Sequence, residues 1–273
     1  MQGNSVIFTD LDGTLLEYRS YSFKPALPAL RFVKSKNIPL VICTSKTRAE
    51  IEFYRNLLDN NDPFISENGG GIFIPEGYFS DDFDYDKKTE GYKVIELGTR
   101  HGVLVEALSS LRDEAGLNVK GFSEMTVSEI SEISGLSNEF AELAKTREYD
   151  EPFIIYGDER DNERIRAEIN RMGFNHTEGG IFHHIMGKSD KGKAVSILTR
   201  LFKQKFCDLQ TIGIGDSLND LPMLESVDIP ILVKKPNGEY DRRIQLNNLV
   251  LAEGIGPEGW NKAVLNLFER NSV

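Results

Sequence analysis

The stretch VIFTDLDGTLL, residues 6–16, places two acids at the end of an apolar run. Val6, Ile7 and Phe8 predict a buried strand, because β-branched and aromatic residues in a short run suit a sheet that is covered on both faces. If the chain stays extended through Asp12, the side chains of Asp10 and Asp12 point to the same side of that strand. Two like charges at this range need a cation or a shared proton.

Two alternative interpretations of this stretch involve no catalysis. An EF-hand calcium loop has its glycine at the sixth position and a glutamate at the twelfth, whereas Gly13 would take the fourth, so the spacing excludes that loop. An Asp-Gly turn whose acids only face water stays open while the stretch is considered alone. The rest of the chain has to decide between a turn and a functional site.

The composition indicates a soluble, acidic protein. The chain has 273 residues, enough for one large domain or two modest ones, and its 32 basic and 43 acidic residues give a net charge of −11. This charge disfavours non-specific binding to nucleic acid or to anionic membranes. We see no signal peptide and no apolar run of about 18 residues, so we expect a cytoplasmic protein. Cys43 and Cys207 are expected to be reduced core thiols rather than a disulfide framework.

Strands and helices are predicted to alternate in the two outer parts of the chain. The expected strands cover residues 6–9, 38–45, 211–215 and 229–233, with two short strands within 64–74, and the expected helices cover 27–37 and 47–58. Such alternation predicts an α/β fold with a doubly wound parallel sheet. Ligands of such sheets bind beyond the carboxyl ends of the strands.

The middle of the chain predicts a smaller, inserted α+β cap domain. Its expected elements are strands over 92–97 and 152–156, a hairpin over 174–186 that turns at Gly179 and Gly180, and helices over 99–115, between 126 and 145, and around 165–169. The acidic stretch EGYFSDDFDYDKKTEGY leads into this region and GKSDKG leads out of it. We therefore expect a core of residues 1–83 and 187–273 and a cap of residues 84–186.

Four clusters of polar residues lie at strand ends or before a helix, where a doubly wound sheet would collect them in one crevice. They are Asp10 with Asp12, Thr44 with Ser45, Lys188 with Lys191, and Asp216 with Asp220. A phosphomonoester is a dianion and repels a carboxylate nucleophile unless cations neutralise both, so Mg²⁺ and a lysine are needed beside the acids. Together the clusters predict a phosphotransfer site.

The motifs DLDGT, CTS, SDKG and GDSLND resemble the four motifs of the haloacid dehalogenase superfamily of phosphatases. The resemblance implies that Asp10 is the nucleophile and becomes an aspartyl phosphate, while Asp12 protonates the leaving oxygen and then activates water. It implies Mg²⁺ held by the Asp10 side chain, the Asp12 backbone carbonyl and Asp216. Thr44 would hydrogen-bond the phosphoryl group and Lys191 would neutralise it. The supporting residues it implies are Ser45, Asn219 and Asp220.

The position of the insert resembles the superfamily subgroup with a large mixed cap, which includes sugar phosphatases. Within it, TSKT, REYDEPF and GGIFHHIMGKSDKGKA resemble the family of mannosyl-3-phosphoglycerate phosphatases, and the resemblance spans nearly the whole chain. The substrate that this implies carries a phosphate, a carboxylate and a sugar, so we expect cations and hydrogen-bonding groups around it. The candidates for substrate binding are Lys46, Arg147, Glu151, His183 and Lys188.

Some of these residues have a purely structural alternative. Arg147 and Glu151 could form a solvated salt bridge at a helix end. His183 and His184 are adjacent on a predicted strand and point to opposite faces, so one of them is expected only to pack. The stretch SENGGG, residues 66–71, is expected to be a turn, although it would lie near the crevice if the sheet order is as predicted.

Other activities stay open from the sequence. Phosphomannomutases share the nucleophile motif and a comparable cap, so a phosphosugar mutase is one alternative, and a phosphosugar-binding protein without turnover is another. Other sugar phosphatases, acting on glucosyl-3-phosphoglycerate or sucrose phosphate, complete the set. The expected partner is a small phosphorylated sugar-glycerate, with no nucleic acid and no membrane, and the oligomeric state is open.

Overall fold

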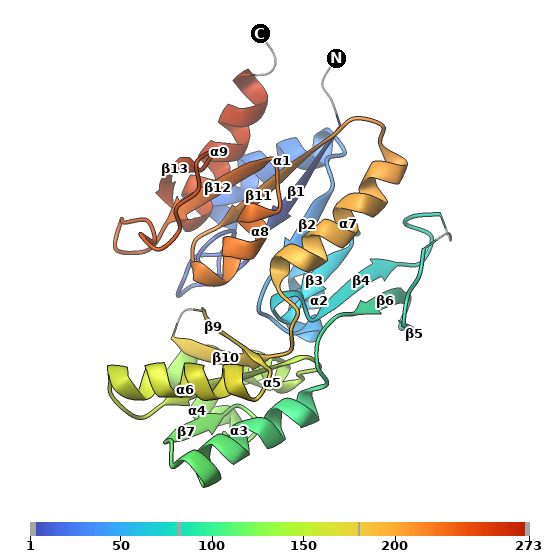
Figure 1. Ribbon diagram of the computed structural model, residues 1–273. Coiled ribbons are helices and arrows are strands. Elements are labelled where there is room, and N and C mark those ends of the chain that lie inside the picture. Colours follow the sequence, from blue (N-terminus) through green and yellow to red (C-terminus); the bar gives the residue numbers. More distant parts are fainter. Residues whose placement is uncertain (1–3, 81–82, 180, 271–273) are drawn as a thin grey trace.

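Two β-sheets organise the part of the chain that the structure describes, residues 4–80, 83–179 and 181–270 of a computed structural model. The larger sheet has nine strands in the order β13-β12-β11-β1-β2-β3-β4-β6-β5, and the smaller has four in the order β7-β8-β10-β9. In Figure 1 the larger sheet and its helices form the upper part of the molecule, the core, and the smaller sheet belongs to the cap below it.

The core sheet is parallel from β13 to β3 and antiparallel from β3 to β5. Its strands are β1 (Asn4–Thr9), β2 (Leu40–Cys43), β3 (Phe64–Ser66), β4 (Gly71–Pro75), β5 (Lys87–Thr89), β6 (Tyr92–Glu96), β11 (Leu209–Gly215), β12 (Ile229–Lys234) and β13 (Val250–Ile255). Val6, Ile7 and Phe8 are fully buried in the central strand β1, as predicted for a strand covered on both faces. The carboxyl ends of β1, β2 and β11 therefore lie side by side.

Helices cover both faces of the core sheet, which confirms the doubly wound prediction. They are α1 (Leu27–Ser35), α2 (Arg48–Leu58), α7 (Lys191–Lys205), α8 (Leu221–Glu225) and α9 (Gly256–Arg270). Helices α1, α2 and α9 bury Val33, Ile51 and Trp260 in the hydrophobic cluster on one face. Helices α7 and α8 bury Leu198 and Met223 in the cluster on the other. The sheet is thereby shielded from water except at its ends and edges.

The cap is an antiparallel sheet with helices on both sides. Its elements are α3 (His101–Ala115), β7 (Val119–Gly121), α4 (Val127–Ser134), α5 (Asn138–Lys145), β8 (Asp150–Ile155), α6 (Glu159–Arg171), β9 (Asn175–Gly179) and β10 (Phe182–Met186). Helices α3 and α6 pack on the face that carries Phe153 and Ile185. Helices α4 and α5 pack beside Phe182, together with Tyr21 of the core. The β9–β10 hairpin occurs where it was predicted, and Gly180 in its turn lies outside the described residues.

The strands of residues 87–96 belong to the core sheet. The predicted boundary at residue 84 had placed them in the cap. Strand β6 pairs antiparallel with β4, from Gly71 opposite Glu96 to Pro75 opposite Tyr92, and β5 pairs with β6. The chain crosses to the cap only after β6, and it returns at Gly187, where a Cβ atom would lie 2.5 Å from Thr99 Oγ1. The sequence pattern of a strand does not tell which sheet the strand joins, and this is why the boundary was misplaced.

The two cysteines differ in their surroundings. Cys43 is buried in β2, as predicted, whereas Cys207 is exposed just after the end of α7. The prediction of a core thiol is therefore wrong for Cys207, because the chain turns there between a helix and a strand and leaves the core. Among the described helices, none combines the length and the apolar character that crossing a membrane requires.

Candidate active site

The acids of the first and last motifs meet at the carboxyl ends of the neighbouring strands β1 and β11. Asp10 directly follows β1, and its backbone N–H donates to Ile214 O at 3.0 Å. Asp216 directly follows β11. Carboxylate oxygens of Asp10, Asp216 and Asp220 lie within 4.8 Å of one another, and all three residues are buried. The parallel pairing of the two strands thus brings together acids that are about 200 residues apart in sequence.

Lys191, the first residue of α7, is the cation inside this cluster. Its Nζ lies 2.9 Å from Asp10 Oδ1 and 2.6 Å from Asp220 Oδ1, and its side chain is fully buried. The second oxygen of Asp220 accepts hydrogen bonds from the backbone N–H groups of Asp216 and Ser217. Asp220 therefore orients the lysine and the loop. Among the described residues no hydrogen bond reaches Asp10 Oδ2 or Asp216 Oδ2, so both oxygens are left for a ligand.

The charges of this cluster do not balance within the protein. Burial raises the pKa of Asp10 to about 7, against the effect of Lys191 and with that of the other acids. Burial also raises the pKa of Asp216 well above its usual value, and the charges of Asp220 and Asp10 add to this. A divalent cation between the carboxylates of Asp10 and Asp216 would offset this repulsion, so the residues present fit a metal with oxygen ligands.

Asp12 lies in a turn and not on an extension of the strand. Strand β1 ends at Thr9, and the N–H groups of Thr14 and Leu16 both donate to Leu11 O. The condition under which Asp10 and Asp12 would share one side of the strand, an extended chain through Asp12, is therefore not met. Gly13 closes the turn with a φ of +76°, and a Cβ atom on it would lie 3.0 Å from Asp216 Oδ2. Glycine is required there by its conformation and by the approach to the acid cluster.

Asp12 is paired with Lys46, which follows the end of β2. Lys46 Nζ lies 2.9 Å from Asp12 Oδ2 and 3.2 Å from Glu50 Oε1, and only 4% of Lys46 is exposed. The other oxygen of Asp12 is buried and has no hydrogen-bond partner among the described residues. Lys46 was predicted to bind substrate. It does line the cavity described next, but its charge is already taken by two carboxylates.

A cavity of about 130 Å³ separates this cluster from the cap. The core lines it with Asp10, Asp12, Tyr18, Tyr21, Ser45, Lys46, Glu50, Asp216, Ser217 and Asn219, and the cap with Phe122, Ser134, Leu136, Ala144, Arg147, Pro152, Gly179, Ile181, Phe182 and His184. Thr44, which directly follows β2, is fully buried and does not line the cavity. The cavity thus has acids on one wall and mostly apolar and aromatic groups on the other.

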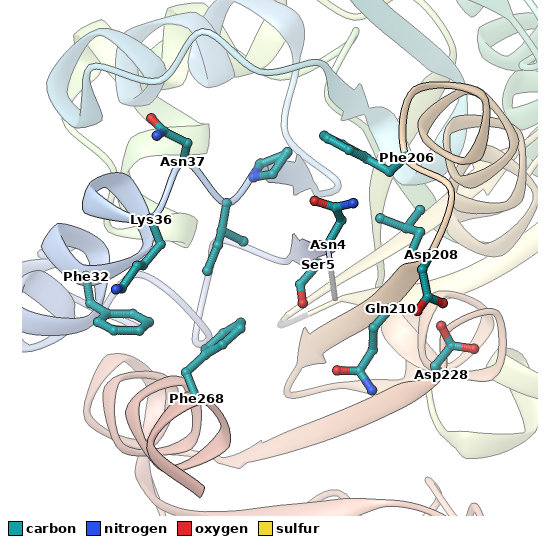
Figure 2. A pocket seen from close by; sticks show the side chains of 13 residues that line it. Asn4, Ser5, Phe32, Lys36, Asn37, Phe206, Asp208, Gln210, Asp228 and Phe268 are labelled. Atoms are coloured by element: carbon teal, nitrogen blue, oxygen red, sulfur yellow. The ribbon is translucent and has the colours of Figure 1, made fainter. Parts of the chain in front are cut away.

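A larger cavity, of about 750 Å³, lies at the opposite ends of the same strands (Figure 2). Its lining includes Asn4 and Gln210 near the amino ends of β1 and β11, with Phe32 and Phe268 from the helices beside them. None of the predicted site residues lines it. The size of a cavity therefore does not identify the site, because Asp10, Asp12 and Asp216 line the smaller one.

Of the predicted cap residues, Arg147 lines the active-site cavity and three others do not. Arg147 Nη1 donates to Ser45 O at 2.7 Å, and its Nε donates to Ala144 O at 2.9 Å. Glu151 is buried on the other face of the cap sheet, where it accepts hydrogen bonds from Ser123. Glu151 and His183 point away from this cavity and Lys188 is exposed outside it, so the structure does not bring these three predicted residues to the acid cluster.

His183 instead belongs to a second cluster of possible metal ligands, with His176 and Glu178. The three residues lie on the face of the cap sheet that α3 and α6 cover, and His183 Nδ1 lies 3.0 Å from His176 Nε2. Both oxygens of Glu178 are taken by arginines, Arg166 at 2.7 Å and Arg243 of the core at 3.1 Å. This carboxylate is therefore already neutralised, and it ties the cap hairpin to the core.

Buried polar residues meet where cap and core join, and sequence reasoning placed this stretch near the crevice only on the condition of the sheet order. Glu67 and Asn68 have positive φ values of 47° and 54°, and a Cβ atom on the next residue, Gly69, would lie 2.2 Å from Asp190 O. Glu67 accepts hydrogen bonds from the backbone N–H groups of Glu148 and Tyr149, which lead into β8. The one signal in the sequence was the stretch SENGGG, because Asn and Gly tolerate this left-handed backbone.

The fold and the acid cluster define a class of enzyme, which comparison with known proteins identifies. The haloacid dehalogenase-like hydrolase family matches residues 7–240 of this chain, and the chain belongs to that family. Hydrolases of this family are generally metal-dependent. A phosphatase of the haloalkanoate (HAD) enzyme superfamily from Bacteroides thetaiotaomicron has the same fold, with a TM-score of 0.67 at 16% identity over 99% of this chain and 96% of that one.

Two relatives are similar over most of the sequence. A glucosyl-3-phosphoglycerate/mannosyl-3-phosphoglycerate phosphatase of Methanococcoides burtonii is 48% identical over 267 residues, which cover 98% of each protein. A mannosyl-3-phosphoglycerate phosphatase of Pyrococcus furiosus is 39% identical over 228 residues, 84% of this chain and 90% of that protein. The resemblance of the four motifs to the superfamily is thereby confirmed.

Proposed function

We propose that the protein is a Mg²⁺-dependent phosphatase that hydrolyses mannosyl-3-phosphoglycerate to mannosylglycerate and phosphate through an aspartyl phosphate. One observation carries the proposal: Asp10 holds one oxygen on Lys191, at 2.9 Å, and keeps the other free beside Asp216 at the floor of the cavity. This is the arrangement that a carboxylate nucleophile needs. The names of two similar relatives support the choice of substrate.

In the first half of the reaction, Asp10 Oδ2 attacks phosphorus and the bond from phosphorus to the glycerate oxygen breaks. Asp12 gives that oxygen its proton, and Lys191 neutralises the transferring oxygens. In the second half, Asp12 takes a proton from a water molecule whose oxygen attacks phosphorus, and the Asp10 carboxylate is restored. The oxygen of Asp12 that Lys46 does not hold is suited to this proton transfer.

The donor set supports Mg²⁺ as the metal. The Asp10 carboxylate, Asp216 Oδ2 and the Asp12 carbonyl offer hard oxygen donors without nitrogen or sulfur, and Mg²⁺ prefers such ligands. When bound, Mg²⁺ would neutralise negative charge on the phosphate and on the nucleophile. Thr14 and Ser217 donate their hydroxyls to the other oxygen of Asp216, at 3.3 and 3.2 Å, and so orient that carboxylate.

The cap wall supports a substrate larger than a simple phosphate ester. Arg147 offers a cation for a carboxylate, while Phe122 and Phe182 offer apolar surface for a sugar ring. The glucosyl ester is a second candidate substrate, because the 48% identical relative is named for both the glucosyl and the mannosyl compound.

Phosphate release from a panel of esters tests this function. We expect mannosyl-3-phosphoglycerate to exceed mannose 6-phosphate, sucrose phosphate and 3-phosphoglycerate by at least ~100-fold in kcat/KM, since two or three contacts of ~1–2 kcal/mol each give about that ratio. Phosphate should appear in solution and not on a second sugar hydroxyl, which separates a phosphatase from a mutase. Equal or better turnover of the hexose phosphates would reduce the proposal to a generic phosphatase.

A further inference from the structure

His184 presents a polar atom to the active-site cavity from the cap. Its strand position, opposite Pro152, directs the side chain to the cavity, and 4% of the residue is exposed. Nδ1 of His184 lies 2.9 and 3.0 Å from the two oxygens of Asp150, which is fully buried. Because a carboxylate only accepts hydrogen bonds, Nδ1 carries the hydrogen, and in the neutral ring Nε2 is an acceptor.

Nε2 of His184 has no hydrogen bond among the described residues. A Cβ atom on Gly179 would lie 3.4 Å from this nitrogen and 3.4 Å from Asn219 Nδ2, so the two nitrogen atoms flank the same glycine. Nε2 therefore lies where the cap meets the loop of the last core motif. A ring nitrogen that lines a cavity without a protein partner is available for a hydrogen bond with a ligand.

A chain of hydrogen bonds links this histidine to the acid cluster. Asp150 Oδ2 accepts from Asn68 Nδ2 at 2.8 Å, and Asn68 Oδ1 accepts from Asn219 Nδ2 at 3.2 Å. Ser217 Oγ then lies 2.9 Å from Asn219 Oδ1 and 3.2 Å from Asp216 Oδ1. The position of the imidazole is thereby tied to the loop that carries Asp216.

Lys46, the lysine on the cavity wall, is already engaged by Asp12 and Glu50. We infer that His184 recognises the sugar of the substrate and that its Nε2 accepts a hydrogen bond from a sugar hydroxyl. Asp150, Asn68 and Asn219 are positioning residues that fix the tautomer and location of the ring. The inference rests on the proposed sugar-phosphate phosphatase function.

Two replacements of His184 distinguish recognition of the sugar from a purely structural role of this residue. In His184→Asn the side-chain amide reaches the place of Nδ1 and can still donate to Asp150, whereas in His184→Gln the amide extends to the place of Nε2. We expect His184→Asn to lower kcat/KM for mannosyl-3-phosphoglycerate about tenfold, as the loss of one hydrogen bond does, and His184→Gln to recover part of it. Both should stay within about twofold of the wild type on 3-phosphoglycerate, which lacks the sugar, and on p-nitrophenyl phosphate. His183→Asn, on the opposite face, is the matched control and should change none of these values by more than about twofold.

The controls distinguish the possible failures. Full activity of His184→Asn on the glycosylated substrate would leave the histidine a structural role and overturn the inference. An equal loss of kcat/KM on 3-phosphoglycerate would also overturn it, because His184 would then recognise the glycerate carboxylate and not the sugar. If the wild type instead prefers another sugar phosphate, the proposed function fails, and the same comparison is made between that ester and p-nitrophenyl phosphate.

Discussion

The two walls of the cavity are built by different means. On the core wall, Asp10 and Asp216 leave adjacent parallel strands directly, and Lys191 starts the helix beside them. On the cap wall, Arg147 and His184 lie on separate elements of an antiparallel sheet and its connections, and they are oriented by Ser45 O and by Asp150. The core wall thus depends on the ends of strands, whereas the cap wall depends on which face of a strand each residue occupies.

This difference implies a division of chemistry. The core wall contains the nucleophile, the lysine and the oxygens that fit a metal, so changes there should affect every phosphate ester alike. The cap wall touches only what lies beyond the phosphate, so changes there should affect one substrate more than another. The predictions that follow test this division, beginning with the largest effect.

Asp10→Asn should remove the chemistry of the core wall and leave the cap wall intact. The amide keeps the volume of the side chain but cannot form the acyl phosphate, so kcat should fall by at least about 10⁴-fold. The fall should be the same for mannosyl-3-phosphoglycerate and for p-nitrophenyl phosphate, measured as phosphate or nitrophenol release. Circular dichroism of the variant should match that of the wild type. Retained turnover in a folded Asp10→Asn protein would remove the aspartyl phosphate from the mechanism.

Removal of divalent metal should have the next largest effect. Asp10 and Asp216 leave two carboxylate oxygens without a partner among the described residues, and only a cation can offset their repulsion of a phosphate dianion. Excess chelator should lower kcat by about 10²–10³-fold on both substrates, and added Mg²⁺ should restore it. Ca²⁺, which prefers longer bonds and more ligands, serves as the comparison ion. Activity that persists after dialysis against chelator contradicts this account of the core wall.

Arg147→Ala should weaken substrate recognition by the cap wall and leave the chemistry of the core wall intact. It removes the guanidinium that donates to Ser45 O and Ala144 O and that offers a cation for the carboxylate of the proposed substrate. We expect kcat/KM for mannosyl-3-phosphoglycerate to fall about 10- to 30-fold, while the value for p-nitrophenyl phosphate changes by less than about threefold. Arg112→Ala, at a partly exposed arginine on α3 of the same cap, is the control. A parallel loss on both substrates would assign Arg147 to folding rather than to recognition.

The same division decides what could be predicted from the sequence. Asp10 and Asp216 end apolar runs, and the alternation of strands and helices predicts that such ends meet, so the core wall followed from local patterns. The cap wall did not. A shift of one residue along β10 exchanges the faces of His183 and His184, and a sequence pattern does not define that register when neither face is continuously apolar.

Contacts between distant segments were equally out of reach. Asn68 and Asp150 are 82 residues apart and meet only because Glu67 and Asn68 adopt a left-handed backbone at the junction of cap and core. Strand β6 was predicted as a strand but assigned to the wrong sheet, because its pairing with β4 depends on the tertiary fold. The sequence pattern here defines whether a segment is a strand or a helix, but it does not define which other segment that strand pairs with.

The smallest expected effect is a pH dependence of stability that belongs to the core wall. Burial raises the pKa of Asp10 from its ordinary 3.8 to about 7. A carboxyl with a higher pKa in the folded chain stabilises the fold fully below the lower value, and this contribution is lost as the pH rises through the higher one. The metal-free protein should therefore lose stability through Asp10 between about pH 4 and pH 7. Bound Mg²⁺ replaces the proton, so saturating Mg²⁺ should raise Tm by about 5 °C or more at pH 8 and by much less at pH 5. Thermal unfolding in chelator and in Mg²⁺ at both pH values measures this difference.

Two groups serve as controls for this prediction. Glu67, whose pKa burial raises to about 8, lies outside the acid cluster and should contribute equally with and without metal. The Asp10→Asn variant, which has no carboxyl to titrate there, should lose much of the difference, whereas an equal Mg²⁺ effect at pH 5 and pH 8 would separate the metal from these acids.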